Sequence, residues 1–265
     1  MAESSPITNS IMKNNFTLPC NKALKVLFSS IVILAAWELI ALIVNDSYFM
    51  PDVIETFKAL VNILSSGSFL KVIFTAFYRV FSGLVIGIIL GVVLATLCFK
   101  FDILNTILSP IVSIMKATPV ACIIVLLWIR LNYTEIAIFV VVLMVLPIVW
   151  QNVFDGYKAI DTSLVEVAEI FELSYLRKLK VLIIPSILSY LLPAIITSVG
   201  LAWKAEIAAE IMTNSNIGKL IYNFKTVSYD TASIFAWTVI IVVFSIIFEG
   251  ITKCFLGRLA NELKD

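Results

Sequence analysis

Apolar runs long enough to cross a lipid bilayer recur along this chain of 265 residues. Hydrophobic residues make up 61 % of the sequence and charged residues only 14 %, far from the balance of an ordinary soluble domain. A helix needs about 20 apolar residues to cross about 30 Å of hydrocarbon. We therefore expect an all-α polytopic membrane protein, since the short alternating segments of a β-barrel are not found. The six predicted spans are 26–44, 72–98, 103–129, 134–154, 184–205 and 232–252.

The basic residues predict which side of the membrane each loop faces. Six spans put both chain ends on one side, where eleven lysines and arginines fall against five on the other. Cytoplasmic loops carry the excess of Lys and Arg, so both termini and the loop at 155–183 are predicted to be cytoplasmic. Residues 1–21 lack the apolar core of a signal peptide. We expect cytosolic tails at 1–25 and 259–265 around a transmembrane domain at 26–258.

One segment between two apolar runs cannot be a span. The stretch Asp161–Pro185 carries seven charged residues, each of which costs about 2.5–3.5 kcal/mol at the centre of a bilayer. Its apolar and acidic residues follow helical spacing, with Asp161 or Thr162 as the predicted N-cap, and a basic segment follows at 175–181. Two short helices meeting at an angle would form a rigid projection for a partner. The acidic face disfavours the alternative, a helix lying flat on anionic lipid.

The second predicted span carries a stripe of small residues. Gly83, Gly87 and Gly91 recur at a spacing of four, which on a helix lets another helix approach closely. The stripe predicts helix packing, either within the chain or between two copies.

The third predicted span is interrupted by proline. Ser109–Pro110 and Thr118–Pro119 bracket Lys116 within an apolar run, and proline removes backbone hydrogen bonds and bends helices. A broken helix with an ammonium group indicates a permeation path. The alternative is that Lys116 extends to the membrane interface or pairs with a carboxylate.

The residue types also exclude several classes of function. Histidine is absent and the net charge is +1, so we expect no metal site and no nucleic-acid partner. The four cysteines are dispersed and are expected to pack passively. Glu38 and Glu249 sit singly in their predicted spans, which argues against an intramembrane hydrolase. An ion-driven carrier is disfavoured because no internal repeat is found.

Three stretches and the charged loop resemble one transporter family. The stretches are TAFYRVFSGLVIGIILGVVLA (75–95), SPIVSIMKATPVACIIVLLWIRL (109–131) and SVGLAWKAEIAAEIMTNSNIGKLI (198–221). In the loop, the family pattern E-A-A-x3-G-x9-I-x-L-P reads Glu166, Val167, Ala168, Glu172, Leu182, Ile184 and Pro185. Over about residues 30–258 the chain resembles the membrane subunit of binding-protein-dependent ABC importers, in the aliphatic-sulfonate, taurine and nitrate branch.

The chain departs from the family pattern at two glycines. Glu172 replaces the glycine that lets the two short loop helices turn, so we expect the corner to shift or the helix to run on. Asn216 stands where glycine is common, and asparagine tolerates left-handed backbone angles.

The resemblance implies a type I ABC importer permease in a prokaryotic inner membrane, acting as a dimer, with a homodimer expected. Its cytosolic loop would dock on a separate ABC ATPase, and an extracytoplasmic binding protein would deliver the substrate. The chain has no G-x4-G-K-[ST] phosphate loop, so we expect no catalytic residue and no cofactor of its own, with ATP and Mg²⁺ bound by the ATPase. The expected substrate is a small metabolite or oxyanion resembling sulfonate, taurine or nitrate; the alternative is a thiamine precursor or another small metabolite.

The resemblance also implies roles for particular residues. The predicted ATPase-docking residues are Glu166, Ala168, Glu172, Ser174 and Tyr175. The residues predicted to line the translocation path are Lys116, Thr118, Trp203 and Lys204. The segment Glu210–Gly218 is expected to lie outside the membrane and to contact the binding protein.

Overall fold

A computed structural model describes residues 19–262, with side chains described for 24–258. Within this part of the chain all regular secondary structure is helical. Of the predicted tails, residues 1–18 and 263–265 lie outside the described residues, whereas 19–25 and 259–262 belong to α2 and α12. The helices are α2 (Pro19–Val44), α3 (Val53–Leu64), α4 (Phe69–Lys100), α5 (Asp102–Ala117), α6 (Val120–Leu127), α7 (Tyr133–Lys158), α8 (Thr162–Ile170), α9 (Tyr175–Lys178), the π-helical turn η1 (Leu179–Ile183), α10 (Ile184–Met212), α11 (Asn216–Thr226) and α12 (Thr231–Glu262).

The predicted number of spans is confirmed, with one of them broken. Five helical segments are long and apolar enough to cross a membrane: Leu24–Val44, Phe69–Lys100, Tyr133–Lys158, Tyr175–Met212 and Thr231–Arg258. The bent pair α5 and α6 makes a sixth when it is counted as one span. Most observed spans extend beyond their predicted ends, because helices continue past the hydrocarbon into the flanking polar regions.

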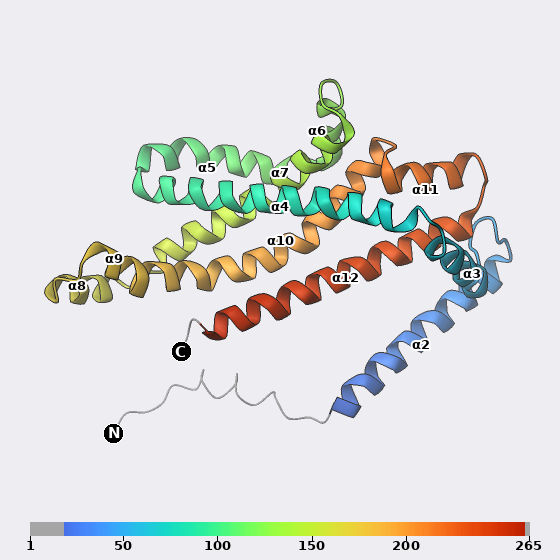
Figure 1. Ribbon diagram of the computed structural model, residues 1–265, viewed down its shortest axis with the longest axis horizontal. Coiled ribbons are helices and arrows are strands. Elements are labelled where there is room, and N and C mark those ends of the chain that lie inside the picture. The colour runs from blue at the N-terminus through green and yellow to red at the C-terminus, as the bar shows by residue number, and fades with distance from the viewer. Residues whose placement is uncertain (1–18, 263–265) are drawn as a thin grey trace.

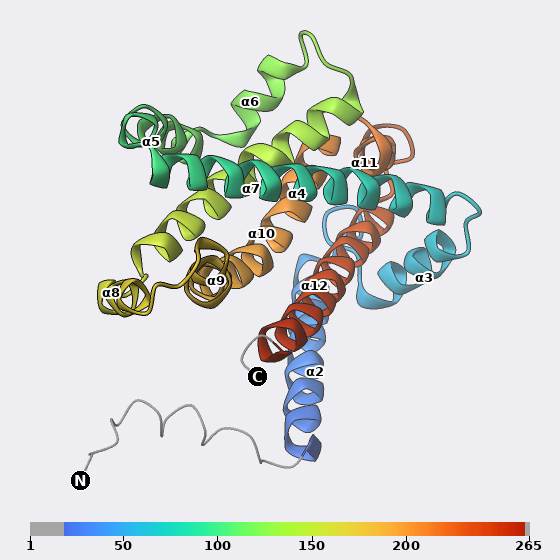
Figure 2. The same ribbon diagram turned by 60° about the vertical axis from the view of Figure 1, so that its left-hand side comes forward.

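Helix α7 forms the centre of the bundle. It packs most extensively against α4 and α10, while α12 lies along α10 (Figure 1). Valines of α7 at 140, 141, 145, 149 and 153 are almost completely buried. Helix α2, by contrast, is nearly all exposed and contacts the rest of the chain mainly through α3. The second view shows α2 and α12 on one side of the bundle, away from α5 and α6 (Figure 2).

The glycine stripe packs α4 against α7. A Cβ atom built on Gly83 would lie 2.5 Å from the Cβ of Val141, and equivalents on Gly87 and Gly91 would lie 2.9 and 2.8 Å from Val145 and Val149. Each distance is shorter than a normal contact between carbon atoms, about 3.5–4.0 Å. The stripe therefore accommodates a matching valine row within the same chain, as the intramolecular interpretation predicts.

The third span breaks at one proline and not at the other. Thr118, directly before Pro119, takes an extended ψ of 126°, because the ring of the following proline disfavours helical backbone. Helices α5 and α6 consequently meet at a bend of 98°. Pro110 lies inside α5, which continues to Ala117, so the predicted interruption at Ser109–Pro110 is wrong. The helix gives up one backbone hydrogen bond there without ending.

The two ends of the bundle carry different short helices. Helices α8 and α9 project at one end, and α3 and α11 lie at the other (Figure 1). Glu38 of α2 accepts a hydrogen bond from the N–H of Val53 at 3.1 Å, at the start of α3, so this carboxylate satisfies a free helix donor. The predicted topology makes the α8–α9 end cytoplasmic and the α11 end external.

Candidate functional site

The charged loop, residues 161–185, begins with a capped helix. Asp161 is the N-cap of α8, and its Oδ1 accepts hydrogen bonds from the hydroxyl of Ser163 at 2.7 Å and from the N–H of Ser163 at 2.9 Å. These hydrogen bonds lower the pKa of Asp161 from its ordinary value, the one from the Ser163 hydroxyl more than the one from the Ser163 N–H. The predicted helix start is confirmed.

Helix α8 ends where the family pattern has its glycine. Glu172 has a left-handed φ of 49°. Its N–H donates to the carbonyl of Glu169 at 2.9 Å, and the N–H of Leu173 donates to the carbonyl of Ala168 at 3.0 Å. These two bonds form a Schellman motif, which normally uses glycine at this position. The expectation of a shifted corner or a longer helix is wrong, because a Glu with its Cβ adopts the left-handed angle itself.

An ion pair connects the second short helix to the first. Ser174 precedes α9 with an extended ψ of 151°, and the Nζ of Lys178 lies 3.6 Å from the Oε1 of Glu169. Helix α9 then continues through η1 into α10 without a break. The loop is therefore a rigid corner at the end of a membrane span.

Large apolar side chains are exposed on this corner. Ile170, Phe171, Tyr175 and Leu176 are 72–77 % exposed, within the charged loop at the α8–α9 end of the bundle (Figure 1). Ala168, by contrast, is buried at 2 %, and the predicted docking residues Glu166, Glu172 and Ser174 are exposed. Exposed aromatic and aliphatic groups of this size mark an interaction surface.

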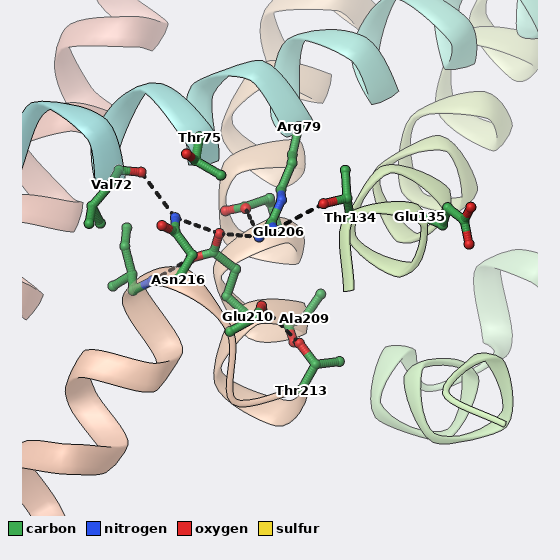
Figure 3. Close-up of polar contacts among 12 residues, drawn as sticks. Val72, Thr75, Arg79, Thr134, Glu135, Glu206, Ala209, Glu210, Thr213 and Asn216 are labelled. Atoms are coloured by element: carbon green, nitrogen blue, oxygen red, sulfur yellow. Dashed lines mark hydrogen bonds and ion pairs between the residues drawn. The ribbon is translucent and has the colours of Figure 1, made fainter. Parts of the chain in front are cut away.

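At the opposite end, a buried cluster of charges joins α4 to α10. Arg79 donates from Nη1 to Glu210 Oε1 at 2.7 Å, and the same Nη1 lies 3.9 Å from Glu206 Oε1. Its Nη2 donates to the Thr134 hydroxyl of α7 at 3.1 Å. Both carboxylates have no exposed surface, and neither Glu206 oxygen has a hydrogen-bond partner among the described residues. Figure 3 shows Arg79 between the two acids and Thr134.

Glu210 also holds the start of α11 in place. Its Oε1 accepts from the side-chain amide of Asn216 at 2.8 Å, and its Oε2 accepts from the N–H of Ile217 at 3.0 Å (Figure 3). Asn216 has a left-handed φ of 45°, as its replacement of glycine predicts. A Cβ on Gly218 would collide with the backbone carbonyl of Glu210. A cavity of about 480 Å³ lies beside the cluster, with Lys219 in its wall.

This geometry changes the interpretation of the segment Glu210–Gly218. Glu210 itself is buried and so cannot offer its side chain to an outside partner, because Arg79 pairs with it inside the bundle. Arg79 and Glu206 were missed by the sequence analysis. For Arg79 the signal was available, since it lies inside the predicted span 72–98 and an ionisable residue there indicates a function or a partner. Glu206 lies one residue beyond the predicted span 184–205.

The predicted path residues at the broken helix lie near the bend. The Nζ of Lys116 is 3.4 Å from Gln151 Oε1, and the amide of Gln151 donates to Asp155 at 3.1 Å. Lys116 thus reaches a carboxylate through an intervening amide. The hydroxyl of Thr118 donates to the carbonyl of Ile114 at 2.7 Å, which satisfies a carbonyl at the end of α5.

Trp203 and Lys204 meet at a second cavity between α10 and α12. It has a volume of about 300 Å³, and Lys204 and Glu249 line it. Trp203 also lies in its wall but is only 1 % exposed, and its Nε1 donates to the carbonyl of Ile241 at 3.1 Å. We call this cavity the Lys204 pocket. Lys116 and Thr118 are not among its lining residues.

Comparisons with known proteins agree with this architecture. Residues 83–261 match the family described as the binding-protein-dependent transport system inner membrane component. A Bacillus subtilis protein named as an aliphatic sulfonates transport permease, SsuC, is 25 % identical over 88 % of this chain and 83 % of its own length. An ABC transporter permease protein of Methanocaldococcus jannaschii is 23 % identical over 69 % of this chain and 70 % of its own length.

A solved structure shares the fold. It is a chain from the crystal structure of an amino acid ABC transporter with histidines, 16 % identical in sequence. The two folds superpose with a TM-score of 0.58 over 72 % of this chain and 91 % of the other.

Proposed function

Because the chain belongs to the family of binding-protein-dependent transport system inner membrane components, and is thus a permease subunit of the ABC transporter type, we propose that it is half of the membrane pathway of an ATP-driven importer. Two copies form the path at their interface. A separate ABC ATPase supplies the energy, and an extracytoplasmic binding protein supplies the substrate. ATP and Mg²⁺ are held by the ATPase, and both termini of the chain face the cytoplasm.

The exposed apolar corner of the charged loop is the observation that carries the coupling role. Phe171, Tyr175 and Leu176 project from a rigid helical corner, where water would otherwise cover them at a cost of about 25 cal/mol per Å². Glu166 and Glu172 are exposed on the same loop. We assign the ATPase contact to this surface, while Ala168 supports it by packing inside the loop.

The charged residues within the spans support a path at a dimer interface. Lys116 and Lys204 are exposed on the described chain although both lie in apolar helices. An ammonium facing lipid is costly, so these faces are expected to meet water or a second copy of the chain. Trp203 directly precedes Lys204 in the sequence, and Thr118 is two residues from Lys116.

The proposed substrate is a small anion of the sulfonate, taurine or nitrate kind. The exposed ammonium groups of Lys116 and Lys204 attract negative cargo, and the Bacillus subtilis relative is named as an aliphatic sulfonates transport permease. A thiamine precursor or another small metabolite is the alternative, because a binding protein can set the selectivity of such a system.

Affinity purification from the native membrane tests the coupling surface. We expect the wild-type chain to retain an ABC ATPase, and Phe171→Asp and Tyr175→Asp to retain about tenfold less, because each places a charge in an apolar contact. Tyr229→Asp makes the same chemical change at an exposed residue of the α11 end and should retain as much as the wild type. If both loop variants retain the ATPase, the assignment of the contact is wrong. Substrate uptake without any ATPase would favour an ion-driven carrier.

A further inference from the structure

The Lys204 pocket combines a charged side with an apolar side. Lys204 of α10 and Glu249 of α12 provide the charges, and Ile241, Val242 and Ile246 of α12 provide an apolar wall. Its volume of about 300 Å³ is at the lower end of the range for small-molecule sites. The space therefore suits a ligand of few heavy atoms with one polar end.

The charges in and directly beside the pocket do not cancel. Glu249 Oε1 lies 2.6 Å from the Nζ of Lys253, four residues further along α12. Lys204 makes no hydrogen bond or ion pair with any side chain between 24 and 258. Two ammonium groups therefore face one carboxylate, and that carboxylate is engaged by Lys253. Lys204, Glu249 and Lys253 together carry a net charge of +1, and Lys204 lies inside a helix long and apolar enough to span the membrane.

We propose that the Lys204 pocket binds a small organic anion with a short aliphatic chain, and that this is a substrate site on the path of the proposed function, on which the inference rests. The anionic head binds at the Lys204 ammonium. The aliphatic tail packs on Ile241, Val242 and Ile246. An anion supplies the missing counter-charge, whereas a cation would add to the net positive charge.

The two sides of the pocket predict different parts of the ligand preference. Each methylene that leaves water for the apolar wall raises the affinity about fourfold. Binding should therefore strengthen from methanesulfonate to ethanesulfonate to propanesulfonate, and sulfate and nitrate, which have no tail, should bind more weakly. An anion site without the apolar wall would not distinguish the three sulfonates in this way.

Fluorine NMR of 2,2,2-trifluoroethanesulfonate with the purified chain in lipid nanodiscs measures this binding directly. Empty nanodiscs provide the blank, and the three alkyl sulfonates are used as competitors. We expect saturable binding by the wild type. Lys204→Gln should bind about tenfold more weakly, as expected for the loss of one short charge contact, and Lys204→Arg should stay within about threefold of the wild type.

Glu249 and Lys253 make the test independent of folding defects. Glu249→Gln removes the negative charge beside the site, so this variant should bind several-fold more tightly, a gain that misfolding does not produce. Lys253→Gln frees the Glu249 carboxylate and should weaken binding. Lys225→Gln, on α11, is the matched control and should bind like the wild type.

Three results would overturn the proposal: no saturable binding by the wild type, equal binding by Lys204→Gln, or weaker binding by Glu249→Gln. The outcome is separable from that of the proposed function. If an ATPase copurifies with the chain but the chain does not bind sulfonates, the importer function stands and the proposed ligand site in the Lys204 pocket is refuted. If the chain binds sulfonates but retains no ATPase, the ligand site stands and the proposed ATPase contact is refuted.

Discussion

The contact between the glycine stripe of α4 and the valine row of α7 predicts a graded loss of stability. At Gly83→Ala the new methyl group would lie 2.5 Å from Val141 Cβ and 2.9 Å from the carbonyl oxygen of Ile138. Normal carbon contacts are about 3.5–4.0 Å, so the helices must separate locally by about 1 Å. A gap of this size loses a quarter to a half of the dispersion energy of the contacts that it opens.

The expected cost follows from these distances. Overpacking a tight interface costs about 1–3 kcal/mol, and we expect Gly83→Ala at the upper end of that range. Gly91→Ala, whose methyl would meet Val149 at 2.8 Å, comes next, followed by Gly87→Ala at 2.9 Å from Val145. Gly250→Ala is the matched control, because a Cβ there has no neighbour within 4 Å, and its stability should equal that of the wild type.

SDS titration of the purified chain in mixed micelles, followed by tryptophan fluorescence, measures the order of stability of these variants. Helices persist in SDS, so the higher helix propensity of alanine contributes little to the difference. The double variant Gly83→Ala with Val141→Gly should cost less than the sum of its parts, because the two residues are in contact. Equal unfolding midpoints for Gly83→Ala and Gly250→Ala would refute the packing argument.

Three further predictions concern the charged residues. Arg79→Met should lower the free energy of unfolding by about 3–5 kcal/mol, because it leaves buried carboxylates without a cation; adding Glu210→Gln should restore part of the loss in the same titration. Glu172→Gly should stabilise the loop by about 1 kcal/mol, because glycine adopts the left-handed φ without strain. Slower hydrogen exchange of the Leu173 amide would show this gain, and an unchanged exchange rate would show that Glu172 is not strained. Ser163→Ala should raise the pKa of Asp161 towards its ordinary value, measured by carboxyl ¹³C NMR. Because folding lowers this pKa, the stabilisation of α8 by Asp161 is present above the unfolded-state pKa and is lost as the pH falls through the folded-state value.

The spans and the loop could be predicted because they depend on local patterns. Apolar length determines the membrane helices, and Asp161 caps α8 through a neighbour two residues away. The break at Pro119 follows from the effect of proline on Thr118. Pro110 is also a proline after a hydroxyl residue, yet it lies inside an uninterrupted helix. The residue types alone therefore could not show which of the two prolines breaks the span.

The buried charges depend on distant parts of the chain and could not be located in this way. Arg79 and Glu210 are 131 positions apart in the sequence, and no helical spacing or other local pattern indicates that they meet. Trp203 was predicted to line the path from the resemblance to the transporter family; its ring is almost completely buried in the wall of the Lys204 pocket, and its Nε1 donates to the carbonyl of Ile241. The docking and path assignments stay predictions.

The continuous helix from Tyr175 to Met212 has a mechanical consequence. Its 38 residues give a length of about 57 Å at 1.5 Å per residue, from the exposed corner to the neighbourhood of Glu210. A helix of that length that moves as one body acts as a lever, and a tilt of about 5° around its midpoint moves each tip by about 2.5 Å. The hydrogen bond between Arg79 and Glu210 spans 2.7 Å. A small tilt produced on one side of the membrane thus gives, on the other side, a displacement about as long as the hydrogen bond between Arg79 and Glu210.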